Sequence, residues 1–92
     1  MYKASNMKEV VENSIKAGWY YFDDDTMAFW GSEICTELFD NDTFVICEDN
    51  FDRSKRLYSV RKYNHEDASV DTIVFQKFDK LKDAIACAKE CD

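Results

Sequence analysis

The stretch LYSVRKY, residues 57–63, decides the fold, because its side chains alternate as those of a half-buried β-strand do. Its even-numbered side chains would face one side of a sheet and its odd-numbered side chains the other. Runs of β-branched and aromatic residues lie on both sides of it, at 43–47 and at 70–75. The polar loop 48–55 and the turn 64–67 separate the three runs, and short connections favour antiparallel neighbours. The centre of the chain therefore predicts an antiparallel meander.

Two further strands are predicted before this meander, at 27–30 and 34–39, each preceded or followed by an acidic turn at 23–25 or 40–42. Helical spacing of apolar residues predicts a first helix over 6–17, where Asn6 and Glu9 resemble a capping box. A last helix follows Asp79 and carries an apolar stripe that runs from Phe78 to Ala88.

These elements predict one domain over residues 1–92, of α+β class, with two layers. The sheet has four to five antiparallel strands in a meander, and the N-terminal and C-terminal helices are expected on the same face of it. The sequence contains no apolar run of 18 residues, so we expect no membrane span. The first residues lack the apolar stretch of a signal peptide, which predicts a cytoplasmic protein with reduced cysteines.

The charge divides unevenly along the chain. Residues 1–52 carry twelve Asp and Glu against three Lys, and residues 53–92 carry seven acids against nine Lys and Arg, which together make the net charge of −7. An acidic half repels nucleic acid and attracts basic surfaces. The interpretation that follows is a carboxylate-rich face that contacts a basic partner, with Trp30 as an aromatic anchor. The candidate carboxylates are Asp23, Asp24, Asp25, Asp40, Asp42, Glu48 and Asp49.

The same acids have two other interpretations. They can form a solvated rim without a partner, or they can bind calcium. An EF-hand loop needs a Gly at its sixth position and a Glu at its twelfth, and neither acidic run supplies both.

A basic and aromatic stretch gives an alternative function. Five cationic residues lie within ten positions, and tyrosines interleave with them, as in proteins that stack single-stranded bases. This accessory nucleic-acid-binding site would consist of Arg53, Lys55, Arg56, Tyr58 and Arg61. The net charge of −7 argues against nucleic acid as the main partner. The plainer interpretation is that these cations balance the acids across the sheet, on neighbouring strands.

The cysteines and the single histidine give a third alternative, a metal or redox protein. Cys87 and Cys91 share a helix face, and Cys35 and Cys47 lie on neighbouring predicted strands, but no C-x-x-C pair is present. Core or surface thiols are the plainer interpretation. His65 lies in the polar turn 64–67, where a solvated side chain is expected rather than a nucleophile's base.

Three stretches together resemble a group of small proteins encoded by bacteriophages and mobile elements. They are FWGS at 29–32, the strand 57–63 followed by DTI at 71–73, and the helix that carries Phe78, Leu81, Ala84 and Ala88. The resemblance covers residues 26–90 and implies a compact α+β domain in a phage setting.

If that setting holds, a compact acidic protein suits inhibition of host defence, because CRISPR effectors hold nucleic acid in basic channels. The expected function is thus a non-enzymatic, anti-CRISPR-like protein without cofactor or membrane partner. It would bind the basic surface of a nucleic-acid-handling host protein in the cytoplasm.

Overall fold

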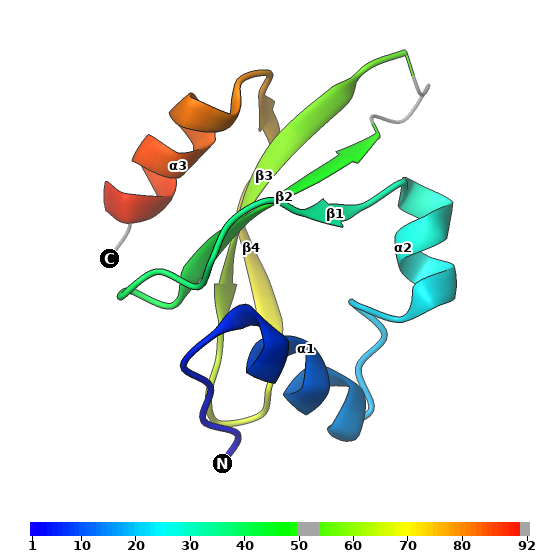
Figure 1. Ribbon diagram of the computed structural model, residues 1–92, viewed down its shortest axis with the longest axis vertical. Coiled ribbons are helices and arrows are strands. Elements are labelled where there is room, and N and C mark those ends of the chain that lie inside the picture. The colour runs from blue at the N-terminus through cyan, green and yellow to red at the C-terminus, as the bar shows by residue number, and fades with distance from the viewer. Residues whose placement is uncertain (50–53, 91–92) are drawn as a thin grey trace.

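The computed structural model of the chain describes residues 1–49 and 54–90. Its strands form one antiparallel sheet in the order β1-β2-β3-β4 (Figure 1). This arrangement confirms the α+β meander with a helix at each end of the chain. The elements are α1 (Met7–Lys16), α2 (Asp24–Trp30), β1 (Glu33–Ile34), β2 (Thr43–Asp49), β3 (Arg56–Tyr63), β4 (Val70–Phe78) and α3 (Leu81–Glu90).

The two terminal helices cover opposite faces of the sheet, which differs from the expected single covered face. Phe44 of β2 packs in a cluster with Val10 of α1, whereas the next residue, Val45, packs with Ala84 and Ala88 of α3. Consecutive strand residues point to opposite faces. The reason lies in β2 itself, since a strand buried on both sides carries a continuous apolar run rather than an alternating one.

The strand predicted at 27–30 is wrong, because these residues form the C-terminal part of α2. Asp24 and Asp25, predicted in a turn, occupy the first helical turn, where carboxylates interact favourably with the positive end of the helix dipole. Gly31 ends the helix in the left-handed conformation at φ 62°. Aspartates before the segment and a glycine after it therefore outweigh the β-propensity of Phe29 and Trp30.

The strand predicted at 34–39 is much shorter than expected, since β1 contains two residues. Beyond β1 the Cys35 amide still donates to the Val45 carbonyl at 2.9 Å, and the Phe39 amide donates to the Thr43 carbonyl at 2.8 Å. The Val45 amide, however, donates to the Thr36 hydroxyl at 3.0 Å, which interrupts the regular backbone ladder. The loop then turns toward α3, where Asn41 Nδ2 donates to the Ala88 carbonyl at 2.7 Å. The strands predicted at 43–47, 57–63 and 70–75 are confirmed as β2, β3 and β4.

The helix predicted over 6–17 is confirmed as α1. Asn6 Oδ1 accepts a hydrogen bond from the Glu9 amide at 2.9 Å, as a helix N-cap does. Glu9 Oε1 in turn accepts hydrogen bonds from the Ser5 hydroxyl, the Ser5 amide and Asn6 Nδ2, and the two bonds from Ser5 lower the pKa of Glu9. Within the described residues, none of the helices is long and apolar enough to cross a membrane.

Candidate functional site

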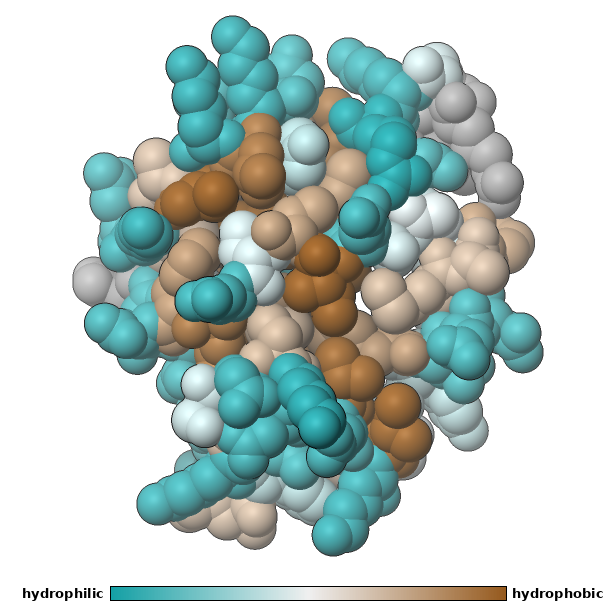
Figure 2. Space-filling model, viewed as in Figure 1, coloured by the Kyte–Doolittle hydropathy of each residue, from teal (hydrophilic) through white to brown (hydrophobic). Residues whose placement is uncertain are grey.

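Helix α2 is the most exposed element of the described chain, and it buries none of its residues. It lies apart from the other helices, at the right of Figure 1. Phe29 is 62 % exposed and Trp30 is 40 % exposed. Figure 2 shows apolar residues across the middle of the same face and out to the position of α2. We call Asp24, Asp25, Phe29 and Trp30 the α2 surface.

The two sides of α2 differ in what they contact. Thr26 and Trp30 are four residues apart, so they share a helix face, and both line a cavity against the sheet. Asp25 and Phe29 are also four residues apart and share the neighbouring, exposed face. The side chains of Asp24 and Asp25 form no ion pair with any residue that the structure describes.

The C-terminal end of α2 is fixed to the sheet by Arg56. Its Nη2 donates to the Gly31 carbonyl at 2.8 Å, and its Nη1 pairs with Asp49 Oδ1 at 3.0 Å. A cation suits this position, because the last carbonyls of a helix carry partial negative charge. A Cβ on Gly31 would lie 2.5 Å from Asp49 Oδ2, so the close approach needs glycine. Arg56 and Asp49 thus position α2.

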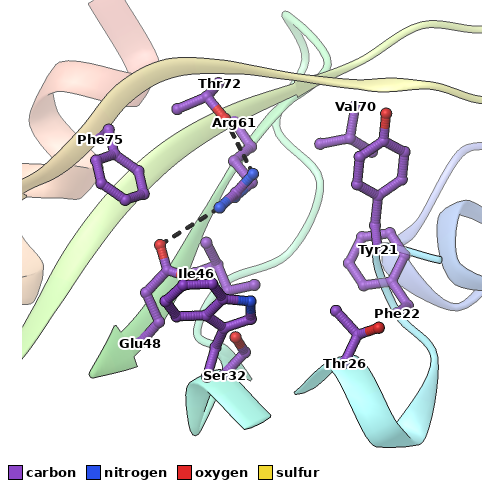
Figure 3. A pocket seen from close by; sticks show the side chains of 11 residues that line it. Tyr21, Phe22, Thr26, Ser32, Ile46, Glu48, Arg61, Val70, Thr72 and Phe75 are labelled. Carbon is purple, nitrogen blue, oxygen red and sulfur yellow. Dashed lines mark hydrogen bonds and ion pairs between the residues drawn. The ribbon is translucent and has the colours of Figure 1, made fainter. Parts of the chain in front are cut away.

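A cavity of about 310 Å³ lies between α2 and the sheet face that carries Phe44 and Ile46 (Figure 3). Aromatic rings and two aliphatic side chains form most of its wall, and β2, β3 and β4 contribute polar groups. The lining consists of Tyr21, Phe22, Thr26, Trp30, Ser32, Ile46, Glu48, Arg61, Val70, Thr72 and Phe75.

A buried ion pair forms the polar part of this cavity. Glu48 Oε1 pairs with Arg61 Nη2 at 3.3 Å, and the two side chains are 5 % and 16 % exposed. The same oxygen accepts a hydrogen bond from Ser59 Oγ at 3.2 Å, and Arg61 Nη1 donates to Thr72 Oγ1 at 3.0 Å. Arg61 Nε is buried and has no acceptor among the described residues.

The predicted acidic residues do not form a single face. Asp40 and Asp42 lie in the β1–β2 connection, on the opposite side of the molecule from α2 (Figure 1). Asp42 pairs with His65, Asp49 pairs with Arg56, and Glu48 is buried. Of the predicted partner-binding residues, the structure places Asp23, Asp24, Asp25 and Trp30 together at α2. Glu48 lines the cavity beside Trp30, and Asp49 lies next to Gly31, but the contacts of both are directed into the protein.

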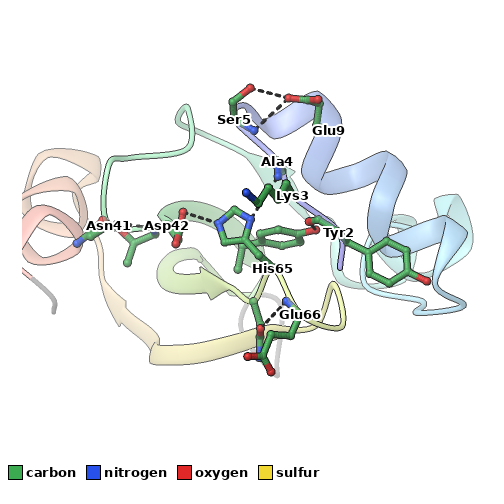
Figure 4. Close-up of polar contacts among 12 residues, drawn as sticks. Tyr2, Lys3, Ala4, Ser5, Glu9, Asn41, Asp42, His65 and Glu66 are labelled. Carbon is green, nitrogen blue, oxygen red and sulfur yellow. Dashed lines mark hydrogen bonds and ion pairs between the residues drawn. The ribbon is translucent and has the colours of Figure 1, made fainter.

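His65 has a structural role that the sequence did not indicate. Its Nε2 lies 2.8 Å from Asp42 Oδ1, and its Nδ1 accepts a hydrogen bond from the Ala4 amide at 3.3 Å (Figure 4). Because an N–H points at Nδ1, the proton of the neutral ring lies on Nε2. The His65 carbonyl also accepts from the Tyr2 amide at 2.6 Å. The histidine therefore holds the N-terminal segment against the β3–β4 turn and is not a freely solvated side chain.

The predicted nucleic-acid-binding residues are used mostly inside the protein. Arg56 and Arg61 form ion pairs, and Tyr58 packs against the cluster beneath α3. Lys55 is exposed. Arg53 lies outside the described residues. Among the described members of this stretch, the structure does not present a continuous basic surface.

Cys35 and Cys47 are free thiols, the first half-buried and the second buried, and Cys87 is half-buried on α3. Burial and the neighbouring Cys47 raise the pKa of Cys35 to about 11. Cys91 lies outside the described residues. In residues 1–49 and 54–90, no three His, Cys, Asp or Glu side chains lie close enough to hold a metal ion.

The comparison with protein families gives one match over nearly the whole chain. Residues 4–89 match the model of a family described as a family of unknown function, DUF7447. No curated protein and no solved structure matches the chain. The family match therefore supports the chain as one unit, while its function has to be argued from the site.

Proposed function

The chain belongs to DUF7447, and we propose that it is a protein-binding module that uses the α2 surface to dock onto a basic, partly apolar patch of a partner protein. The observation that carries the proposal is that one helix without buried residues presents two unpaired carboxylates beside two exposed aromatic rings. In a monomer such rings stay in water, and a partner that covers them gains their burial energy.

The α2 surface combines two kinds of recognition. Trp and other aromatic side chains are enriched among the residues that dominate binding energy at interfaces. Carboxylates at the edge of such a patch steer a basic partner toward it and select against acidic ones. Since Asp25 and Phe29 lie on the same helix face, one partner contact would engage both. The partner should therefore present a Lys or Arg next to an apolar side chain.

The contacts of the basic residues favour this function over nucleic-acid binding. Arg56, which is 44 % exposed, holds the end of α2 and pairs with Asp49, and Arg61 neutralises the buried Glu48, so both cations already have partners within the protein. The unpaired charges at the α2 surface are negative and would repel phosphates.

The narrower form of the proposal names the partner as a nucleic-acid-handling defence protein of a bacterial host, such as a CRISPR effector, in the cytoplasm. Its support is the sequence resemblance to phage proteins together with the negative charge of the α2 surface. A basic channel that holds nucleic acid has the charge that this surface would select.

The experiment is a capture assay with the tagged protein in a nuclease-treated lysate of the source cells or of their host. Asp24→Asn/Asp25→Asn should reduce the amount of captured partner at least tenfold, because the variant loses both the electrostatic attraction that steers a basic partner and the charge contacts at the edge of the interface. Phe29→Ala should also reduce it. The matched control is Glu12→Gln/Glu90→Gln, which makes the same charge change on α1 and α3. Equal capture by all variants, or a partner that disappears with nuclease, would refute the proposal.

A further inference from the structure

The cavity beneath α2 has the dimensions and walls of a small-molecule site. Its volume of about 310 Å³ lies at the lower end of the range for ligand pockets. Aromatic side chains come from both sides of it, with Tyr21, Phe22 and Trp30 from the α2 side and Phe75 from β4 (Figure 3). Rings on opposite sides of a narrow cavity favour a flat occupant, because flat faces stack.

The Glu48–Arg61 pair, which we call the polar floor of the cavity, determines which net charge a ligand can carry. Glu48 and Arg61 neutralise each other at 3.3 Å. A cationic ligand would meet the guanidinium of Arg61, and an anionic ligand would meet the carboxylate of Glu48. A neutral ligand avoids both penalties, so the ion pair selects an uncharged molecule.

The hydrogen-bonding groups of Glu48 and Arg61 that have no described partner indicate which polar groups the ligand should carry. Both hydrogen bonds to Glu48 go to Oε1, which leaves Oε2 as an acceptor without a described partner. Arg61 Nε is a buried donor without an acceptor among the described residues. An unmade hydrogen bond at a buried donor such as Arg61 Nε is costly. A ligand that supplies an acceptor to Arg61 and, beside it, a donor to Glu48 Oε2 would therefore gain hydrogen bonds at both groups.

From these observations we propose that the cavity binds a neutral, planar heterocycle with a ring N–H next to a carbonyl, as in the base of guanosine. The ring N–H donates to Glu48 Oε2, and the carbonyl accepts from Arg61 once the guanidinium adjusts to the ligand. The ring stacks between Trp30 and Phe75. The cavity shares Trp30 with the α2 surface, and Phe29 contacts Trp30 with ring centroids 5.1 Å apart, whereas Asp24 and Asp25 do not line the cavity.

The charges around α2 indicate whether the base binds as a free nucleoside or as part of a nucleotide or an RNA. Asp24 and Asp25 are exposed and unpaired among the described residues. They would repel a phosphate attached to the base. The free nucleoside should therefore bind better than guanosine monophosphate or a short single-stranded RNA that contains guanine.

The test is a titration of the ¹⁵N-labelled protein with guanosine, followed by the indole N–H signals of its two tryptophans. The signal of Trp30 should shift and saturate, while that of Trp19, whose indole donates to the Asp67 carbonyl at 2.8 Å, should stay in place. 1-Methylguanosine lacks the ring N–H and should bind at least tenfold more weakly. An absent Trp30 shift, or equal binding of the methylated nucleoside, would overturn the proposal.

Variants separate this site from the protein-docking surface. Glu48→Gln should weaken guanosine binding at least tenfold, and Phe75→Ala, which changes an exposed ring and leaves the floor intact, should also weaken it. Asp24→Asn/Asp25→Asn, which changes the docking surface and no residue of the cavity lining, should bind guanosine as the wild type does. Loss of guanosine binding in Asp24→Asn/Asp25→Asn, or tighter binding of the monophosphate or the RNA than of guanosine by the wild type, would contradict the assignment to a free nucleoside.

Discussion

The Glu48–Arg61 pair gives the sharpest prediction about stability. Glu48→Met leaves the Arg61 guanidinium without its carboxylate, and Arg61→Met leaves the carboxylate without its cation. Breaking a buried pair on one side costs about 3–5 kcal/mol, because an uncompensated charge stays buried. Since Arg61 is 16 % exposed and keeps some contact with water, we expect about 3 kcal/mol for each single variant.

The double variant Glu48→Met/Arg61→Met should behave differently. Two apolar side chains of similar volume leave no buried charge, so its free energy of unfolding should lie within about 1 kcal/mol of the wild type. Ser59 loses its hydrogen-bond acceptor in Glu48→Met and in the double variant alike, so this loss does not contribute to the stability difference between these two proteins. The two single effects should therefore be strongly non-additive.

Urea denaturation followed by circular dichroism measures all three variants. With a slope of about 1–3 kcal/mol per M, a loss of about 3 kcal/mol lowers the unfolding midpoint by at least ~1 M. The control is Glu33→Met, which removes an exposed carboxylate 3.8 Å from Arg56 and should change stability by less than about 1 kcal/mol. Single variants that match this control, or a double variant with the sum of the single losses, would refute a coupled buried pair.

Three other predictions follow from local contacts. Gly31→Ala should lower the free energy of unfolding by about 1–2 kcal/mol, because alanine is strained in the left-handed conformation. The loss should be larger than this because the added Cβ would also clash with Asp49. Urea denaturation measures the loss, and an unchanged midpoint would contradict the prediction. Cys35, with its pKa raised to about 11, should react slowly with a thiol reagent at pH 8 and about tenfold faster per pH unit up to pH 10, as measured by mass spectrometry of its peptide; fast reaction at pH 8 would contradict it. His65→Ala should speed hydrogen exchange at the Ala4 amide, and an unchanged exchange rate would show that His65 does not hold this segment.

The elements that the sequence predicted correctly are those with a clear strand propensity or a helix cap. Strand β3 carries β-branched and aromatic residues, although its burial does not alternate because helices cover both faces of the sheet, and α1 begins at a cap that Asn6 supplies. Helix α2 was missed because seven residues are too few to show a helical period, and Phe29 and Trp30 favour strands by propensity. Its conformation depends on Gly31 and on the tertiary contact with Arg56, which residue spacing does not reveal.

The candidate site was predicted only in part. Trp30 and the aspartates of residues 23–25 were identified by composition, since acids and exposed aromatics are visible in the sequence. The pair of Glu48 with Arg61 depends on the β2–β3 register, which places Ile46 opposite Ser59, and on twist that carries the long side chains together. The sequence predicted that the cations of this stretch balance acids on neighbouring strands, and the pairs Arg61–Glu48 and Arg56–Asp49 confirm it. Which residues pair, and that Glu48 is buried, could not be predicted, because charge counting treats every ionised group as exposed.

The most direct test of the central claim is photo-crosslinking in the source cells or their host. A photoreactive amino acid replaces Phe29 on the α2 surface or, as a control, Lys82 on the exposed side of α3. The account predicts one discrete protein adduct from position 29, none from position 82, and loss of the adduct when Asp24→Asn/Asp25→Asn is added. Adducts of equal yield from both positions, or an adduct at position 29 that the charge change leaves intact, would contradict docking through the α2 surface.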